Sequence, residues 1–144
     1  MFLGTYTPKL DDKGRLIMPA RFRGELAAGL VITGTQEHAL AVYPQATFEE
    51  LFSALLAAPS TLQEVRDYQR MVSSLASEET LDKQGRLSIA PQLRKYANLK
   101  RDAVVIGAMN RVEIWDAEDW REYSEKAEAN FATLDQELLA SLRT

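Results

Sequence analysis

The side chains with the most specific chemistry in this chain are two arginines that occupy the same place in two copies of one motif. Arg15 lies in residues 10–16 and Arg86 in residues 81–87, and these stretches share Leu, Asp, Gly, Arg and Leu at a spacing of 71 residues. A guanidinium group is a flat fork of five N–H donors, which matches the O6 and N7 acceptors of guanine in the DNA major groove. One good pair contributes about 1–3 kcal/mol of discrimination between bases. The motif therefore has the chemistry to bind a nucleobase.

The other shared positions of the motif predict a tight turn with the arginine at its end. Asp11 and Asp82 favour turn initiation, and Gly14 and Gly85 supply a positive φ. Each copy is predicted to form strand, turn and strand, and a two-stranded ribbon fits the major groove. A second interpretation stays open on these residues alone. Each Asp could cap its turn and pair with the arginine, in a turn that is repeated only because a domain was duplicated.

Positive charge is concentrated around the two copies, although the whole chain has a net charge of −4. Residues 9–23 have a balance of +3 and residues 82–101 a balance of +5, so the remainder sums to −12. This pattern predicts a basic face on an acidic body, as in nucleic-acid-binding proteins, unless the charges simply alternate on a solvated surface. Flanking basic side chains and turn N–H groups are predicted to hold phosphates. The predicted DNA-contacting residues are Arg15, Arg86, Lys13, Lys83, Lys9, Arg21 and Arg23.

Few residues in the chain could support enzymatic chemistry. His38 is the one histidine, it lies in a polar connection, and there is no cysteine. A lone loop histidine is usually a solvated side chain rather than a general base, and the spacings of metal ligands, phosphate-binding loops and nucleophile motifs are missing from the sequence. We therefore predict no enzymatic activity, no metal, no cofactor and no small-molecule substrate. No stretch approaches the ~18 apolar residues of a membrane span, so a soluble cytoplasmic protein is expected.

The elements that must position the motif are repeated as well. Pro19 and Pro91 each follow the second strand of the motif and are predicted to open a short helix. The inward positions of these helices are Phe22, Leu26, Leu93 and Ala97. Two apolar runs then follow each helix and predict a further hairpin in each copy. These runs span residues 30–34, 39–43, 103–107 and 112–115.

Two helical regions lie outside the repeated elements. Pro44 begins a helix with one apolar face, and Ser60 with Gln63 predicts a capping box for the next helix. The apolar positions of the first helix are Phe48, Leu51, Phe52 and Leu55. After Asp116, a good N-cap, one continuous helix is predicted over five turns. Its apolar positions are Trp120, Tyr123, Ala127, Phe131, Leu134 and Leu138. This apolar stripe is larger than a small domain can bury on its own, so part of it is expected to contact another subunit.

These patterns predict an α+β, β-rich fold that is built from two tandem units. The units span residues 5–48 and 77–120, a helical insert spans 49–76, and a C-terminal helix spans 121–144. Units of about 45 residues are too small to be stable alone, so they are expected to pack on each other or on neighbouring chains.

The chain resembles the MraZ family of transcriptional regulators, which belongs to the AbrB-like superfamily. The likeness rests on the doubled Asp-x-x-Gly-Arg hairpin, the Met-Pro-Ala-Arg-Phe-Arg run at 18–23 and the opening residues 1–4, and it covers essentially the whole chain. The resemblance implies two AbrB-like swapped-hairpin β units in tandem, related by a pseudo-two-fold axis, with an inserted helical pair and a C-terminal helix. The family's motif positions fall on Arg15, Arg86, Asp11 and Asp82.

The same resemblance implies a function and an assembly. The expected protein is a nucleoid-associated homo-oligomeric ring that binds short G-rich direct repeats of double-stranded DNA in the promoter of its own division and cell-wall operon, usually as a repressor. The second copy departs from the first, with Gln84 in place of Lys13 and Lys83 in place of Asp12. Whether both hairpins contact bases therefore stays open. The sequence also leaves open the number of subunits, the sequence and spacing of the operator, and whether the protein represses or activates a given promoter. The alternatives are an AbrB-fold antitoxin and a structural ring protein that does not bind DNA.

Overall fold

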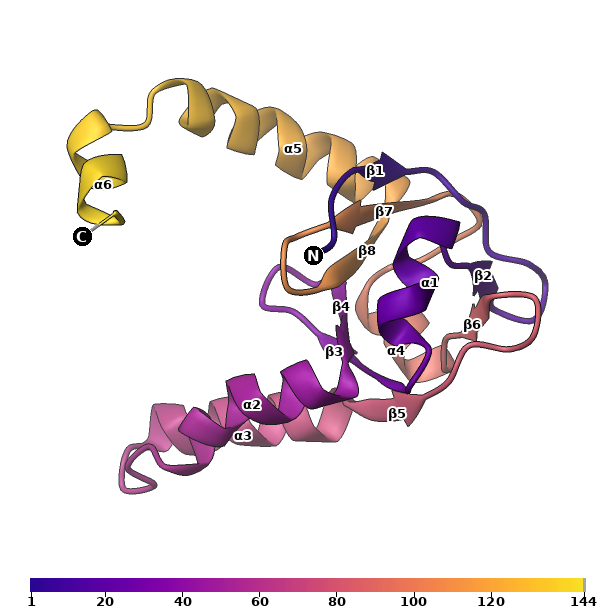
Figure 1. Ribbon diagram of the computed structural model, residues 1–144, viewed down its shortest axis with the longest axis horizontal. Helices are drawn as coiled ribbons and strands as arrows, with labels where there is room; N and C mark the ends of the chain where they lie inside the picture. The colour runs from indigo at the N-terminus through magenta and orange to yellow at the C-terminus, as the bar shows by residue number, and fades with distance from the viewer. Residues whose placement is uncertain (144) are drawn as a thin grey trace.

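Two hairpins of apolar residues form the centre of a six-stranded antiparallel sheet in the computed structural model, which describes residues 1–143 (Figure 1). The hairpins are β3 with β4 and β7 with β8, as predicted, and β4 pairs with β8. The two repeats therefore share one sheet, in the order β1-β7-β8-β4-β3-β5. The strands are β1 Thr5–Tyr6, β3 Leu30–Gly34, β4 Leu40–Pro44, β5 Ser77–Glu79, β7 Ala103–Gly107 and β8 Val112–Asp116.

The edge strands of this sheet are exchanged between the repeats. β1, from the first repeat, pairs with β7 of the second, and β5, from the second repeat, pairs with β3 of the first. Neither repeat can complete its part of the sheet alone. This exchange explains physically why two units of such small size form one body.

A separate two-stranded ribbon is formed by β2 (Arg15–Ile17) and β6 (Arg86–Ser88), one strand from each repeat (Figure 1). Each motif closes its own turn, since the Asp11 N–H donates to the Arg15 carbonyl at 2.9 Å and the Asp82 N–H to the Arg86 carbonyl at 3.0 Å. The prediction that each copy also pairs its own two strands is correct only for a bridge between Leu10 and Leu16, because the second strand of each motif pairs with its counterpart in the other repeat. Leu16 lies opposite Leu87, and both side chains are fully buried. Pairing between the repeats places both leucines in one shared core.

Two short helices, α1 (Ala20–Leu26) and α4 (Pro91–Tyr96), follow the ribbon strands and pack on the main sheet. The predicted inward residues of both helices are buried, and Pro91 is the first residue of α4 as expected. Pro19 instead precedes α1, which begins at Ala20. One apolar cluster joins helices, ribbon and sheet, and it includes Phe2, Met18, Phe22, Leu26, Ile32, Val42, Leu93 and Ile114.

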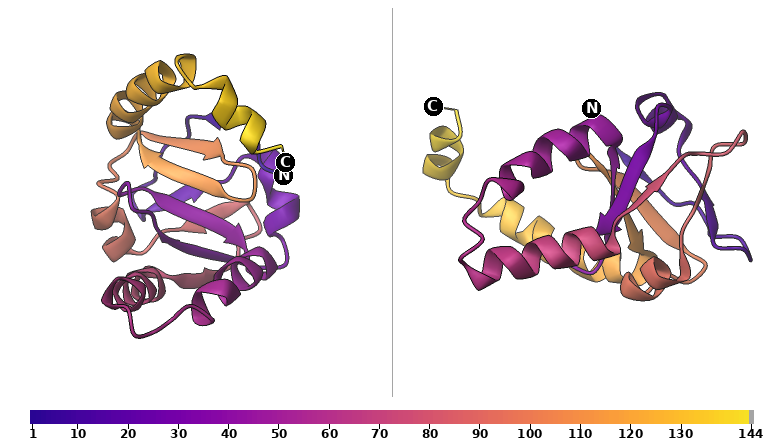
Figure 2. Two further views of the ribbon diagram at one scale, coloured as in Figure 1. Left: turned by 90° about the vertical axis from the view of Figure 1, so that its left-hand side faces the viewer. Right: turned by 90° about the horizontal axis from the view of Figure 1, so that it is seen from below.

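The insert between the repeats is a pair of helices, α2 (Gln45–Leu56) and α3 (Gln63–Leu75), that project from the sheet (Figures 1 and 2). The apolar face of α2 is only partly covered, since none of its residues is buried and Leu51 is exposed. The predicted capping box is also wrong. Helix α3 begins after Leu62 without a side-chain cap, and the Ser60 carbonyl accepts a hydrogen bond from Arg66 Nη1 at 2.7 Å.

The C-terminal region forms two helices, α5 (Ala117–Ala132) and α6 (Gln136–Ser141), rather than the one continuous helix that was predicted. Asp116 caps α5 as expected, accepting from the Asp119 N–H at 3.1 Å. Asp135 caps α6 in the same way, accepting from the Glu137 N–H at 2.8 Å, and this second cap accompanies the break. Helix α5 leaves the body of the molecule, and Phe131 near its end is 77% exposed (Figure 1). No helix within residues 1–143 has the length and apolar character to cross a membrane.

Candidate nucleic-acid interface

The two motif turns have the same internal hydrogen bonds. Asp11 Oδ1 accepts from the backbone N–H groups of Lys13 and Arg15, each at 2.9 Å, and Gly14 takes a φ of 74°. In the second turn Asp82 Oδ1 accepts from the backbone N–H groups of Gln84 and Arg86, each at 2.9 Å, and the φ of Gly85 is 78°. The sequence therefore predicted the turn-forming residues correctly, because the carboxylate and the positive φ are both used.

These hydrogen bonds also keep the two carboxyl groups ionised. The backbone N–H of Arg15 is the largest factor that lowers the pKa of Asp11, and the backbone N–H of Arg86 does the same for the pKa of Asp82. Ion pairs with the same arginines act in the same direction. The turns are thus stable as charged units at neutral pH.

Each motif arginine is held by its own turn at the surface of the protein. Arg15 Nε donates to Asp11 Oδ2 at 2.7 Å, and Arg86 Nε donates to Asp82 Oδ2 at 2.7 Å. The side chains are 26% and 28% exposed. The ion pair between the aspartate and the arginine of each motif, which the sequence left as an open alternative, is therefore present. It uses the Nε atoms, and no hydrogen bond from the terminal amino groups is formed within residues 1–143.

Both arginines lie on the outer face of the ribbon. Because Leu16 and Leu87 point into the core, the alternation of a strand places the residues on either side of them outward. Arg15 stands opposite Ser88, and Ile17 stands opposite Arg86. The ribbon thus carries two guanidinium groups at diagonal positions on one face, with the 54% exposed side chain of Ile17 beside them.

Each turn is covered by an arginine from the other repeat. Arg94 Nε donates to the Ile89 carbonyl at 3.0 Å, and its guanidinium lies over Gly14, where a Cβ atom would stand 2.7 Å from Arg94 Cζ. Arg23 Nε donates to the Met18 carbonyl at 2.9 Å and lies over Gly85 in the same way. Glycine is therefore favoured at these positions for its φ, and a Cβ atom there would also displace the end of the covering arginine.

Sequence reasoning selected Arg23 but missed Arg94. The signal that could have found it is the repeat itself, because Arg94 follows Arg23 at the same spacing of 71 residues that relates the two motifs.

The remaining predicted basic residues occupy different surroundings. Lys9 is paired with Asp102 at 2.5 Å, in a bond where both side chains are exposed. Lys13 and Lys83 are exposed within the turns, and Arg21 is exposed in the first turn of α1. The structure thus brings Lys13 and Lys83 to the two motif arginines, whereas Lys9 already has a carboxylate partner.

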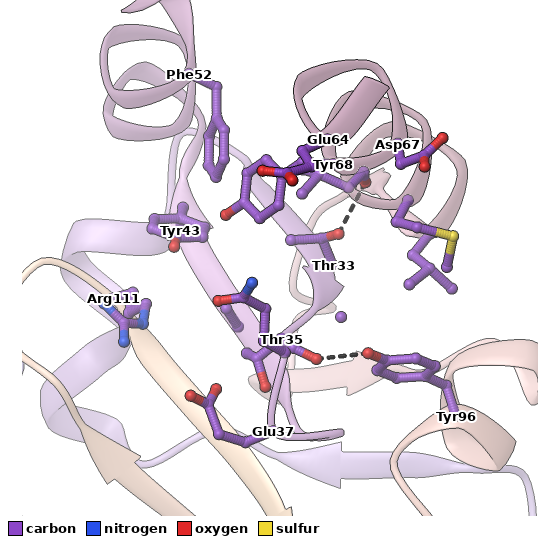
Figure 3. A pocket seen from close by; sticks show the side chains of 16 residues that line it. Thr33, Thr35, Glu37, Tyr43, Phe52, Glu64, Asp67, Tyr68, Tyr96 and Arg111 are labelled. Carbon is purple, nitrogen blue, oxygen red and sulfur yellow. Dashed lines mark hydrogen bonds between the residues drawn. The ribbon is translucent and has the colours of Figure 1, made fainter. Parts of the chain in front are cut away.

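One cavity lies away from the ribbon, between α3 and the sheet. It has a volume of about 610 Å³ and is lined by residues that include Tyr43, Tyr68, Tyr96, Glu64 and Arg111 (Figure 3). The Tyr96 hydroxyl donates to the Thr35 carbonyl at 2.5 Å, and Arg111 is paired with Glu113. None of the predicted DNA-contacting residues lines this cavity.

The one histidine has a structural environment. His38 stacks on the ring of Tyr96 with 4.4 Å between centroids, and its Nδ1 lies 3.3 Å from the Tyr96 carbonyl oxygen. Within residues 1–143, no three His, Asp or Glu side chains gather in a way that could hold a metal ion.

Comparison with known proteins agrees with the doubled architecture. A family model described as "MraZ protein, putative antitoxin-like" matches residues 1–71 and again residues 74–142, one segment for each repeat. The chain belongs to the MraZ family. The resemblance predicted from the repeated motif is thereby confirmed.

Curated relatives of the MraZ family match almost the full chain. A protein of Leifsonia xyli subsp. xyli is 54% identical over 142 residues, which is 99% of each chain. One from Nocardioides sp. is 55% identical over 136 residues, 94% of each chain, and one from Mycobacterium bovis is 48% identical over 142 residues, 99% of each chain. All three carry the name "Transcriptional regulator MraZ". The family is thus one of transcriptional regulators rather than enzymes, as predicted.

Proposed function

We propose that this MraZ-family chain is a sequence-specific DNA-binding regulator that represses its own division and cell-wall operon. It binds short G-rich direct repeats in the promoter as a ring-shaped homo-oligomer, in the cytoplasm at the nucleoid. Its two AbrB-like swapped-hairpin units form the DNA-binding ribbon between them. The observation that supports this proposal best is the placement of both motif arginines on one outward face of that ribbon.

The ribbon has the size and chemistry for the major groove. A two-stranded β-ribbon fits this groove, and an arginine there pairs with O6 and N7 of guanine. Arg15 and Arg86 each supply one fork, and Ile17 supplies an apolar side chain of the kind that contacts the C5-methyl group of thymine. Lys13 and Lys83, in the turns, contact phosphates and set the register.

The ion pairs with Asp11 and Asp82 are compatible with this role. Each carboxylate binds the Nε of its arginine, and the two terminal amino groups remain for an acceptor on the DNA. Because the turn fixes the carboxylate through two backbone hydrogen bonds, the fork is oriented before DNA arrives. A preorganised side chain loses less conformational entropy on binding.

Apolar surface that one chain leaves uncovered supports assembly into a ring. Six apolar side chains between α5 and the C-cap of α6 are at least two-fifths exposed, namely Tyr123, Phe131, Leu134, Leu138, Leu139 and Leu142. Exposed apolar side chains in such number are typical of protein interfaces. Several ribbons in one assembly would bind several repeats of one promoter, and the effective concentration would raise affinity without new contacts.

Fluorescence anisotropy with a labelled duplex that carries G-rich repeats tests the proposal. Arg15→Ala and Arg86→Ala should each lower affinity by about 5- to 150-fold, the equivalent of about 1–3 kcal/mol for one base pair contact. Arg70→Ala is the matched control, because Arg70 also pairs with an aspartate, Asp67, but on α3. Wild-type affinity in both motif variants would overturn the proposal.

A further inference from the structure

We propose that a cavity beside the first motif turn binds a phosphate of the DNA backbone, and that the second repeat supplies its ligands. The cavity has a volume of about 230 Å³, and its cationic lining residues are Arg94, Lys100 and Arg101. This inference rests on the proposed function, since it assigns a second contact to the same DNA. It gives the first turn, in addition to Lys13, a phosphate site whose ligands come from the other repeat.

The cations of the cavity are fixed beside the turn by separate contacts. Arg94 is anchored through Nε to the Ile89 carbonyl and covers Gly14. The backbone carbonyl of Arg101 accepts from the Leu10 N–H at 2.8 Å, so Arg101 is held next to the strand that enters the turn. The Arg94 guanidinium therefore keeps its position relative to the motif, and the backbone of Arg101 is held beside it.

Lys100 makes a smaller contribution. Its Nζ lies 3.1 Å from Oδ1 of Asp116, a carboxylate that is 4% exposed, and 3.2 Å from the Asn98 carbonyl. The positive charge of Lys100 thus mainly compensates the buried Asp116. Arg94 and Arg101 are the two residues that we assign as phosphate ligands.

Two carboxylates also line the cavity, and only one of them forms an ion pair with another residue. Asp11 is already paired with Arg15. Asp12 is exposed, and its side chain makes no ion pair within residues 1–143. After the internal pairs are set aside, the charged lining residues that remain are Arg94, Arg101 and Asp12, which leaves one net positive charge. Asp12 therefore opposes phosphate binding at this site, and removing its charge should strengthen binding.

The corresponding part of the first repeat cannot form such a site. The connection from α4 to β7 comprises residues 97–102 and contains Lys100 and Arg101. The connection from α1 to β3 comprises only residues 27–29, Ala-Ala-Gly, and has no charged side chain. The second turn instead has Lys83 at the position of Asp12. The pseudo-symmetry of the motif is therefore broken in the residues that meet the DNA backbone.

Anisotropy over a salt series tests this inference, with a G-rich duplex and a scrambled duplex of the same length. Because a phosphate contact carries no sequence information, Arg101→Ala should weaken both duplexes by the same factor and reduce the slope of log affinity against log salt by about 1. Asp12→Asn should tighten both, and Asp12→Lys should tighten them further. Arg70→Ala again removes one distant positive charge as the control.

The outcomes separate the two proposals. If Arg101→Ala keeps the wild-type salt slope, or weakens only the G-rich duplex, the phosphate site is wrong even when Arg15→Ala behaves as proposed. Wild-type affinity in both Arg15→Ala and Arg86→Ala would instead contradict the proposal that the ribbon contacts DNA. Arg101 and Asp12 are exposed, so the variants should remain folded, and thermal unfolding followed by circular dichroism checks this.

Discussion

Replacing Gly14 with alanine should destabilise the protein, although the residue lies in a turn at the molecular surface. Its φ of 74° places it in the left-handed region, and its Cα is covered by the guanidinium of Arg94. A methyl group would stand 2.7 Å from Arg94 Cζ and from Nε, well inside van der Waals contact. The end of the Arg94 side chain must then shift, which weakens the hydrogen bond from its Nε to the Ile89 carbonyl.

The expected cost combines two effects that act on the folded state. The left-handed conformation costs an alanine about 1–2 kcal/mol. A hydrogen bond from a charged donor is worth about 1.5–3 kcal/mol, and a partly exposed one is at the low end of this range. Alanine also restricts the unfolded chain, which returns about 0.4–1 kcal/mol. We therefore expect a net loss of about 1.5–3 kcal/mol in the free energy of unfolding.

Urea denaturation followed by circular dichroism measures this loss, and Gly24→Ala is the control. Gly24 lies within α1, and a Cβ atom there would meet no atom within 4 Å, so alanine should stabilise the helix by about 0.5–1 kcal/mol. The two substitutions are chemically identical and should have opposite signs. Combining Gly14→Ala with Arg94→Ala should cost less than the sum of the single changes, because the overlap is removed.

The result that would refute this reasoning is equally specific. A Gly14→Ala variant as stable as the wild type would show that the turn tolerates a side chain. Strict additivity with Arg94→Ala would show that the arginine from the second repeat does not pack on the first turn.

Three further predictions concern the turns, the ribbon and the assembly. Hydrogen bonds lower the pKa of Asp11 and Asp82 in the folded state. The stability that these carboxylates contribute is therefore complete above the unfolded pKa of about 3.9 and is lost as pH falls through the lower folded pKa. Urea denaturation should show that the variant with both residues changed to Asn loses less free energy of unfolding between neutral and acidic pH than the wild type. Replacing thymine by uracil in the G-rich duplex removes the C5-methyl group and should weaken the wild type but not Ile17→Ser, as measured by anisotropy; an equal effect on both would exclude the contact. Phe131→Ser should shift the protein to smaller assemblies in size-exclusion chromatography with light scattering, and a strictly monomeric wild type at micromolar concentration would exclude the ring.

Much of the fold could be predicted because its signals are local. Continuous apolar runs predicted both central hairpins, and Asp116 predicted the start of α5. The repeat spacing predicted that both copies would form the same turn, and hydrogen bonds to Asp11 and Asp82 confirm it. In each case, residues close in sequence contain the whole physical cause.

The features that were missed depend on contacts between distant residues or on competing local signals. Alternation around Leu16 shows which side chains point inward, but it does not identify the partner strand, which comes from the other repeat. Phe131, Leu134 and Leu138 continue at helical spacing across the break between α5 and α6, so periodicity alone predicted one helix. The cap by Asp135 overrides that pattern. Arg94 was missed because its role depends on packing over a turn 80 residues away.

The most direct measurement of the central claim is a footprint on the DNA immediately upstream of the protein's own gene, repeated over a series of salt concentrations. The account predicts protection of regularly spaced G-rich repeats, lost in Arg15→Ala and Arg86→Ala, with binding that weakens steeply as salt rises because phosphates are contacted. Absence of protection, or protection that persists in both variants with a salt slope near zero, would contradict it.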